Sequence, residues 1–420
     1  MSNYDNMAYG KYGVDFEQRI DFDKLRKERL KKAQSTMQAD GISGVLTFNA
    51  DNIRYLTGFY VTTPNRAGEY SFVFCPAVGE PTLFTGIPEE TSRRMPWLNG
   101  RIKADVGSGP SASDAGADSA VIKRQVGEVM ALMAEAGISK NELIGIDGTI
   151  LSGYYMEAFT REGIKTKVCK ATLDKARMIK NSEEIKIMRQ VAMNTEIAFA
   201  SIIKAIEPGV RECDLVGIGI KALYEQGCDH TEDLVCMSGE NTNPYNWTFT
   251  DKVIRPGDLI YIDVDGASYL GYKSCVYRTF CCGKATQEQK DTYAEAYGWL
   301  YDGIAACKKG NTNYDIQKAF PQSPSAWGRD SWEGMDPFCL AHGLGLTLHD
   351  RPFVTHNYVV NKSPEVPLEP GMILAVETYA GKPNQPMGVR LEEMVLVTEK
   401  GPEVLSRFPI KELMECWMPY

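Results

Sequence analysis

Several acidic residues of this chain stand in apolar runs, where a carboxylate is costly to bury. Asp263 and Asp265 lie two residues apart in LIYIDVDG, Glu377 lies in MILAVETYA, and Glu392 and Glu393 are adjacent in VRLEEMVLV. Acidic side chains are almost never fully buried unless they are paired or bind a metal ion. Two carboxylates on one face of a strand repel each other unless a cation or a proton lies between them. The alternative for the Asp pair is a solvated strand end.

Histidine is scarce, and two of the four histidines fall close together. His342 and His349 lie in CLAHGLGLTLHDRP, with glycines between them and Asp350 directly after. Because neighbouring residues of a strand point to opposite faces, one of Glu392 and Glu393 must point inward. Inward carboxylates with one imidazole nitrogen form a ligand set that suits Mn²⁺, Fe or Zn²⁺. The sequence therefore predicts a divalent metal site built from several strands and a Gly-rich loop.

The first 178 residues have the pattern of an α/β domain. The predicted elements are a helix at 24–40, strands at 44–49, 71–76 and 81–86, a small-residue loop at 106–120, a helix that ends near 136 and a strand at 142–148. Strands that alternate with helices in this way are typical of an α/β fold with a mostly open sheet. We therefore predict a first domain over 1–178.

The pattern changes at residue 179. Asn181 and Glu184 match a capping box before a long amphipathic helix, which Pro208 and Gly209 end. Strands are then predicted at 233–239, 252–266, 272–280, 372–380 and 389–401, with two helices between them. A curved antiparallel sheet covered by helices on one side is the predicted assembly, so 179–420 should form a second, α+β domain that carries the metal site.

The composition is that of a globular protein with an acidic balance. Of the 420 residues, 43% are hydrophobic and 24% charged, and the formal net charge is −9. This charge argues against nucleic acid as a partner, because phosphate binding needs a basic surface. No apolar run approaches the roughly 18–20 residues of a membrane helix, and the polar N-terminus lacks the pattern of a signal peptide. The 11 cysteines include no CxxC pair and fit reduced thiols, so we expect a cytoplasmic protein without a membrane partner.

The order of these motifs resembles the pita-bread fold of the creatinase, prolidase and methionine aminopeptidase superfamily. The shared features are the Asp strand, GYKSxxxRTF (271–280), HGxG, the Glu strand and Arg-x-Glu, and NADNIRYLTGFY (49–60) resembles a creatinase-type N-terminal domain. The resemblance implies a creatinase-like N-terminal domain, a pita-bread catalytic domain, a small-molecule substrate and a homodimer. It also implies two metal ions that activate a shared water.

The resemblance also implies roles for individual residues. By position, Asp263 or Asp265 matches the first Asp ligand, and His342, Glu377 and Glu392 match the His and the two Glu ligands. Arg390 and His349 match positions that lie beside the ligands or contact the substrate.

Two positions depart from the peptidase pattern. Cys275 stands where the peptidases have their second, bridging Asp, and Tyr245, Asn246 and Trp247 stand where a substrate-binding His is expected. These changes weaken the case for a two-metal peptidase and leave a single ion as an alternative. For Cys275 three interpretations stay open: a soft metal ligand, a nucleophile, or a residue that only fills space.

Part of the chain resembles the dimethylsulfoniopropionate lyase branch of the superfamily more closely. The shared segments are SGxxTNP (238–244), the D-x-D strand, LEPGM (368–372) and RLEEMVLVTE. This resemblance implies β-elimination that releases dimethyl sulfide and leaves acrylate, with iron or another divalent ion. Tyr245, Trp247 and Phe249 could then form an aromatic wall for an onium group, or they are ordinary core and turn residues.

The match to the lyase branch is also incomplete. The branch has Asp at the position of Cys275, and its catalytic Asp has a different spacing from HGxG, so His349 or Asp350 is the predicted general base. The leading hypothesis is a metal-dependent lyase that acts on a small onium carboxylate. The alternatives are a hydrolase like the Xaa-Pro peptidases or creatinase, and a pita-bread binding protein without catalysis.

Overall fold

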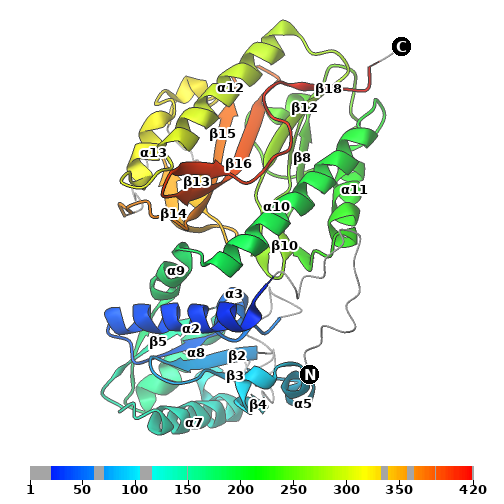
Figure 1. Ribbon diagram of the computed structural model, residues 1–420. Helices are drawn as coiled ribbons and strands as arrows, with labels where there is room; N and C mark the ends of the chain where they lie inside the picture. The colour runs from blue at the N-terminus through cyan, green and yellow to red at the C-terminus, as the bar shows by residue number, and fades with distance from the viewer. Residues whose placement is uncertain are drawn as a thin grey trace. The chain divides into compact units, whose positions relative to one another are not determined.

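The chain forms two compact units, Met1–Arg177 and Met178–Tyr420 (Figure 1). The computed structural model describes residues 20–60, 71–104, 116–148, 150–332, 339–356, 364–383 and 385–418. The predicted domain boundary was 178/179. Most of the predicted loop at 106–120 lies outside the described residues.

A six-stranded sheet organises the N-terminal unit. Its strand order is β4-β3-β2-β1-β5-β6, and the strands are β1 (Gly44–Thr47), β2 (Ser71–Pro76), β3 (Thr82–Thr85), β4 (Ile102–Ala104), β5 (Leu143–Asp147) and β6 (Lys165–Val168). Strand β1 pairs antiparallel with β2 and parallel with β5, so the sheet is mixed. The predicted α/β fold class of this domain is confirmed.

The described helices of this unit include several that were not predicted. They are α2 (Phe22–Ala39), α3 (Ala50–Thr57), α5 (Pro88–Arg94), α7 (Ala120–Glu135), α8 (Ile150–Arg161) and α9 (Lys170–Met178). Only α2 and α7 match predicted helices, whereas α3, α5, α8 and α9 were not predicted. Helix α3 begins at the Asn49 side chain as N-cap and ends at Gly58, whose φ is 81°. Aromatic side chains fill the core between sheet and helices, and the rings of Phe72 and Phe84 stack 4.3 Å apart.

In its described residues, the C-terminal unit has four α-helices. They are α10 (Ser182–Ile202), α11 (Glu212–Glu225), α12 (Gln287–Ala306) and α13 (Asn313–Ala319). The capping box predicted at Asn181 and Glu184 is confirmed at the start of α10. Short 3₁₀ helices occur in both units, at Pro96–Leu98, Gly116–Asp118, Ile203–Ala205, Gly239–Thr242 and Pro324–Ala326.

The strands of the C-terminal unit divide into three sheets, with orders β18-β12-β9-β8, β14-β13-β15-β16-β17 and β11-β10-β7. Their bounds are β7 (His230–Thr231), β8 (Val235–Ser238), β9 (Leu259–Asp263), β10 (Ala267–Tyr269), β11 (Tyr272–Lys273), β12 (Tyr277–Cys282), β13 (Cys339–Gly343), β14 (Asp350–Thr355), β15 (Ile373–Ala380), β16 (Val389–Thr398), β17 (Gly401–Val404) and β18 (Met414–Cys416). The α+β class is confirmed. The single antiparallel sheet that the pattern predicted is divided, and β18 runs parallel to β12.

Helices flank these sheets. Helix α12 packs on β15 and β16, α11 packs on β8, and α10 packs on β10 and β11 (Figure 1). The two larger sheets meet where β12 passes β16, and this meeting line positions the acidic residues singled out above.

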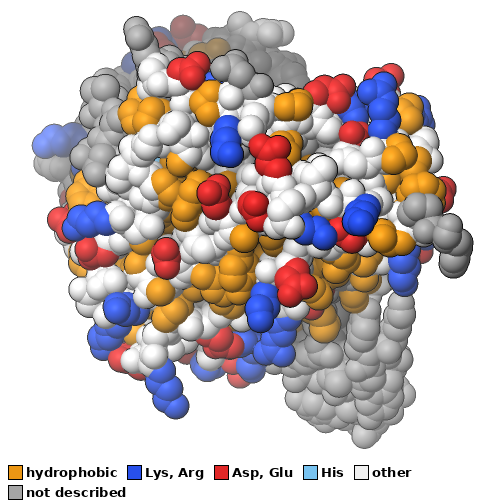
Figure 2. Space-filling model, turned by 90° about the horizontal axis from the view of Figure 1, so that it is seen from above, with side chains coloured by type: hydrophobic (Ala, Val, Ile, Leu, Met, Phe, Trp, Pro, Cys, Tyr) orange, Lys and Arg blue, Asp and Glu red, His pale blue; other side chains and the backbone are white. Residues whose placement is uncertain are grey.

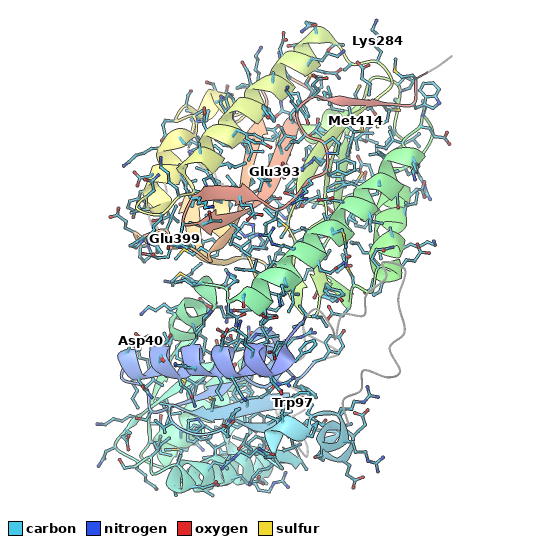
Figure 3. All side chains as sticks on the ribbon, in the orientation of Figure 1. Asp40, Trp97, Lys284, Glu393, Glu399 and Met414 are labelled. Carbon is cyan, nitrogen blue, oxygen red and sulfur yellow. The ribbon has the colours of Figure 1, made fainter. Side chains whose placement is uncertain are left out.

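A buried ion pair joins β12 to β16. Arg278 and Glu393 are each 1% exposed, and Arg278 Nη2 lies 2.9 Å from Glu393 Oε2. The same guanidinium donates to the backbone oxygens of Glu392 and Phe408, at 2.6 and 3.0 Å. Figure 3 shows Glu393 among the strands of the C-terminal unit. Because Glu393 is committed to this pair, its neighbour Glu392 is the glutamate that points to the opposite face.

The surface carries charges of both signs. Figure 2 shows acidic and basic side chains interspersed with hydrophobic ones on the face that it displays. Across the described ranges, no helix is long and apolar enough to cross a bilayer.

Replacing Arg278 with Met should destabilise the protein by about 3–5 kcal/mol, because the Glu393 carboxylate would stay buried without its partner. The exposed pair between Arg189 and Glu403, at 2.7 Å, provides the control. Arg189→Ala should cost no more than about 1 kcal/mol. Urea unfolding followed by circular dichroism measures both changes, and equal losses in the two variants would contradict the structural role given to Arg278.

Candidate metal centre

The backbone around the two aspartates is less regular than the pattern predicted. Strand β9 ends at Asp263, so Asp265 lies beyond the strand and the predicted strand over 252–266 is too long. The predicted strand at 272–280 is also interrupted, because β11 ends at Lys273 and β12 begins at Tyr277. Cys275 lies in this break, and the N–H of Val276 donates to Asp263 Oδ1 at 3.3 Å. The break turns the Cys275 side chain towards the aspartates.

Two groups of potential metal ligands share one atom. Ligand atoms of Asp263, Asp265 and Cys275 all lie within 4.8 Å of one another, and so do those of Cys275, His342 and Glu392. The Cys275 sulfur is therefore close both to an aspartate pair and to a histidine–glutamate pair. All of these side chains are buried except that of Asp265, which is half-buried.

Glu377 and Arg390 come from the two strands that carry the glutamates. In the register of β15 and β16, Glu377 is directly opposite Glu392, and Tyr379 is opposite Arg390. The Arg390 guanidinium donates to the Glu377 carboxylate. It also lies over the rings of Tyr245 and Tyr277, 3.9 Å from each ring centre. Arg390 is therefore the internal cation that balances part of the acid charge.

Burial makes the acid cluster electrostatically costly. It raises the pKa of Asp263 well above its usual value, and the charges of Asp265 and Glu392 raise it further. Burial also raises the pKa of Glu392, with Glu377 as the next cause. It raises the pKa of Asp265 to about 7, against a lowering hydrogen bond from Cys275. Without a further cation besides Arg390, the cluster must therefore hold protons or repel itself.

Several polar atoms in this cluster make no hydrogen bond within the described part of the chain. They are His342 Nε2, both carboxylate oxygens of Glu392 and Asp265 Oδ1. His342 Nε2 lies 3.8 Å from Glu392 Oε1, which is too long for a hydrogen bond. Buried polar atoms without partners are rare in folded proteins, so the space between these atoms has the character of a ligand site.

The imidazole of His342 is oriented as a metal ligand. Its Nδ1 lies 3.0 Å from the Gly343 carbonyl oxygen, which can only accept, so Nδ1 carries the proton and Nε2 offers a lone pair. Burial lowers the pKa of His342 to about 4. The ring is therefore neutral, in the form that binds metals. Together with the carboxylates, this donor set fits a divalent metal ion.

The two residues predicted as general base lie in different surroundings. His349 is exposed, and its ring centre lies 4.4 Å from that of His342. Asp350 is 1% exposed, begins β14, and accepts from the N–H of Arg351 at 3.1 Å. The structure thus places His349, and not Asp350, at the solvent side of the site.

Arg390 changes the aromatic wall predicted from Tyr245, Trp247 and Phe249. The ring of Tyr245 that was expected to face a cationic substrate lies instead against Arg390. Trp247 is 58% exposed, with its ring centre 5.6 Å from that of Tyr245. Of the predicted aromatic residues, Trp247 and Phe249 are open to solvent.

Sequence reasoning missed two residues around this site. Burial and then Glu377, which acts by charge and by a hydrogen bond, raise the pKa of Cys339, so a second thiol adjoins the acids. Glu212 is fully buried, and its carboxylate accepts from the N–H and hydroxyl groups of Ser238 and Thr250 at 2.7–2.9 Å. Ser238 and Thr250 flank the segment that carries Tyr245. Cys339 precedes the HGxG motif by three residues, a weak signal, whereas Glu212 resembles any acid in a first helical turn.

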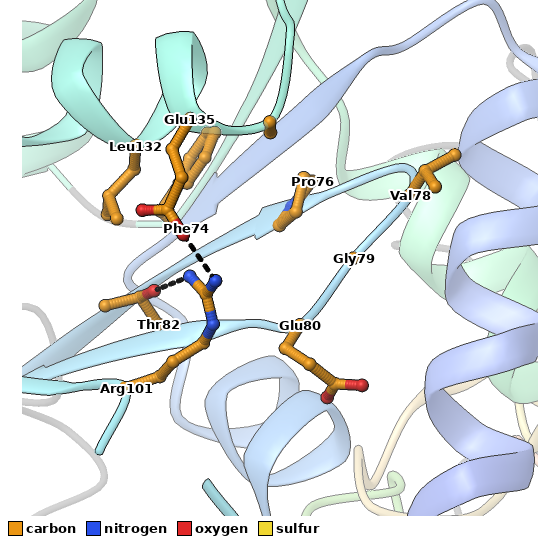
Figure 4. A pocket seen from close by; sticks show the side chains of 10 residues that line it. Phe74, Pro76, Val78, Gly79, Glu80, Thr82, Arg101, Leu132 and Glu135 are labelled. Atoms are coloured by element: carbon orange, nitrogen blue, oxygen red, sulfur yellow. Dashed lines mark hydrogen bonds and ion pairs between the residues drawn. The ribbon is translucent and has the colours of Figure 1, made fainter. Parts of the chain in front are cut away.

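A cavity of about 280 Å³ in the N-terminal unit has no comparable chemistry (Figure 4). Its lining includes Arg101, which is already paired with Glu135 at 2.5 Å. The acid cluster of the C-terminal unit is therefore the candidate site.

Comparisons with known proteins agree with this location. Residues 186–399 match metallopeptidase family M24, and residues 29–179 match the creatinase/prolidase N-terminal domain. The chain is 31% identical to the uncharacterized peptidase YqhT of Bacillus subtilis over 244 residues, which span 58% of this chain and just under two thirds (66%) of that protein. The superfamily resemblance inferred from the motifs is confirmed.

Other relatives include both a lyase and peptidases. The chain is 25% identical to the dimethylsulfoniopropionate lyase DddP of Roseovarius nubinhibens over 425 residues, covering 96% of this chain and 90% of the lyase. It is 27% identical to the Xaa-Pro dipeptidase of Pyrococcus furiosus over 274 residues, covering 64% and 75%. Among solved structures, the Xaa-Pro dipeptidase from Bacillus anthracis has a TM-score of 0.74 at 26% identity, covering 93% of this chain and 99% of that one.

Replacing Glu392 with Gln should separate stability from metal binding. The variant removes one buried charge from a repelling cluster, so the metal-free protein should be as stable as the wild type or more stable. Added Zn²⁺ or Mn²⁺ at 100 times its Kd should stabilise the wild type by about 2.7 kcal/mol, and the variant much less. Thermal unfolding with and without the ion measures this, with Glu403→Gln as the surface control.

An equal metal-induced shift in wild type and Glu392→Gln would contradict the assignment of Glu392. A variant that unfolds at a much lower temperature than the wild type without metal would show instead that Glu392 has a structural role.

Proposed function

The chain belongs to metallopeptidase family M24, and from that premise we propose that it is a metal-dependent enzyme with its active site at the acid cluster of the C-terminal unit. One observation carries this proposal. His342 Nε2 and both Glu392 oxygens are buried, close together and without hydrogen bonds in the described chain. Unsatisfied buried polar atoms lower the stability of the fold unless a bound ligand satisfies them. A pita-bread protein that only binds a partner elsewhere on its surface would have no reason to keep them.

The proposed reaction is β-elimination of a small onium carboxylate such as dimethylsulfoniopropionate. Two observations support a lyase over a hydrolase. Asp263 and Asp265 both join the ligand group around Cys275, as the D-x-D resemblance implies. The sequence match to the lyase extends over 96% of this chain, whereas the matches to YqhT and the Pyrococcus furiosus dipeptidase extend over 58% and 64%.

The residues that would hold the metal are Asp263, Asp265, His342, Glu392 and the adjacent Glu377. A bound divalent ion would supply a Lewis acid towards the substrate carboxylate. Its identity, among Fe²⁺, Mn²⁺ and Zn²⁺, and the number of ions are part of what is to be measured. Arg390 holds Glu377 in place through its ion pair and keeps the site from being wholly acidic.

His349 is the residue we assign to proton abstraction. Its imidazole adjoins that of His342 and is open to solvent, so a bound substrate can reach it. The imidazole takes the proton from the carbon beside the carboxylate, and the C–H electron pair forms the C=C bond. The C–S bond breaks, and its electron pair leaves on sulfur, so the products are acrylate, dimethyl sulfide and a protonated His349.

Charge and exposure also suit a cationic substrate. The cluster of carboxylates attracts an onium group, and the exposed ring of Trp247 offers a face for it. Tyr245 contributes indirectly, because it is stacked on Arg390. By family resemblance we also expect a homodimer.

A second candidate is hydrolysis of Xaa-Pro dipeptides. It is favoured by the likeness to the Bacillus anthracis dipeptidase, with a TM-score of 0.74, and by the HGLGLTLHD spacing that brings His349 to the site. The presence of Cys275 in place of a bridging carboxylate argues against it, since a two-metal hydrolase needs both ions to hold the attacking water.

Purified protein supplied with Fe²⁺, Mn²⁺ or Zn²⁺ should release dimethyl sulfide from dimethylsulfoniopropionate and no proline from Xaa-Pro dipeptides. His349→Asn should lower the rate by about 10²–10⁴-fold, the range for loss of a general base. The control is His230→Asn, which changes a histidine on β7 outside the ligand groups.

Proline release that Glu392→Gln abolishes, without dimethyl sulfide, would replace the lyase by the hydrolase. A protein that binds no metal and turns over neither substrate would contradict the enzyme proposal itself.

A further inference from the structure

Cys275 differs from other buried cysteines of this unit in its surroundings. Cys281 and Cys307 belong to a hydrophobic cluster of the C-terminal unit. Cys275 is 3% exposed, and its sulfur lies 4.0 Å from Asp263 Oδ2. A thiol placed among carboxylates gains little as a hydrophobic filler, because its neighbours are polar. Its position needs another explanation.

The geometry makes Cys275 the shared member of two donor groups. Its sulfur lies within 4.8 Å of ligand atoms of Asp263 and Asp265, and within the same distance of those of His342 and Glu392. Metal–sulfur bonds are about 2.3 Å and metal–nitrogen or metal–oxygen bonds about 2.0–2.2 Å, so two donors on one ion lie at most about 4.5 Å apart. The distances between the ligand atoms therefore need to shorten only slightly for either group to hold an ion together with the Cys275 sulfur.

Independent observations show that these donors lack a ligand. In the described residues, His342 Nε2 and both oxygens of Glu392 have no hydrogen-bond partner, and both side chains are fully buried. The residues that carry these atoms, His342 and Glu392, belong to the same ligand group as Cys275. The thiol therefore does not stand alone.

We propose that Cys275 is a thiolate metal ligand, close both to the aspartate pair and to the His342–Glu392 pair, and that it makes the centre prefer thiophilic ions. This inference rests on the proposed metal-dependent function and specifies the metal. Thiolate ligands favour Zn²⁺ and similar ions, whereas carboxylate sets suit Mn²⁺. The thiol proton leaves to solvent when the ion binds.

The two other roles for Cys275 fit the structure less well. A nucleophile must reach a substrate atom, and the Cys275 side chain is almost completely buried. A free thiolate would also be repelled by the surrounding carboxylates, whereas a cation between them removes that repulsion. A space-filling residue predicts that replacing Cys275 leaves the metal preference unchanged.

Cobalt spectroscopy of the full-length protein tests the proposal. Co²⁺-loaded wild type should show visible ligand-field bands and a sulfur-to-cobalt charge-transfer band in the near ultraviolet. Cys275→Ser and Cys275→Asp should lose the charge-transfer band, and Cys275→Asp should keep the ligand-field bands. Cys281→Ser, a buried cysteine on β12 outside the ligand groups, is the matched control and should keep both.

Competition between ions gives a second readout. The ratio of Zn²⁺ to Mn²⁺ affinity should fall by roughly tenfold or more in Cys275→Asp, since even residues outside the ligand shell change metal affinity by about 10–100-fold. Cys275→Asp restores the family's carboxylate, so it keeps the test valid if Cys275→Ser does not fold.

The outcomes distinguish this inference from the proposed function. Two results would overturn the thiolate ligand but not the metal enzyme. One is a Co²⁺-loaded wild type that shows ligand-field bands without a charge-transfer band. The other is a ratio of Zn²⁺ to Mn²⁺ affinity that is the same in Cys275→Asp as in the wild type. Failure of every protein to bind Co²⁺ would overturn both.

Discussion

The mutual repulsion of carboxylates buried in one place is the constraint on which the C-terminal unit depends. Asp263 and Glu392 are buried within the same cluster, and Asp265 and Glu377 adjoin them. Such a cluster persists only with compensating charge. Arg390 supplies part of it to Glu377 and is itself held between two tyrosine rings. The remaining negative charge is concentrated at donors without partners, which is why we assign a metal ion there.

The strand architecture separates this site from a purely structural charge pair. On β16, Glu392 points to the ligand group, and Glu393 points to Arg278 on the other face. Both carboxylate oxygens of Glu393 accept hydrogen bonds, with Ser406 and Tyr301 as donors in addition to Arg278. One strand thus carries a satisfied carboxylate and an unsatisfied one side by side. The contrast indicates that the Glu392 oxygens serve to bind a ligand, because both oxygens of Glu393 on the same strand have hydrogen-bond donors and those of Glu392 have none in the described chain.

The sequence predicted best those features that depend only on residues near one another in the chain. The capping box at Asn181, the strands around Glu377 and Glu392 and the two-domain α/β plus α+β class follow from periodicity and motifs, and the structure has them. Period-2 alternation failed at Asp265 and Cys275, because β9 and β11 end where the predicted strands continue. Arg390 stacking on Tyr245 and the exposure of His349 depend on contacts between distant segments. No local pattern encodes such contacts.

The central claim is that the buried acid cluster holds a metal ion, and metal content measures it most directly. Elemental analysis of purified protein, after incubation with divalent ions and desalting, should find stoichiometric metal in the wild type. It should find very little in a variant that combines His342→Ala with Glu392→Gln and remains folded. A wild type that retains no Fe, Mn or Zn, or a double variant that retains as much metal as the wild type, would contradict the account.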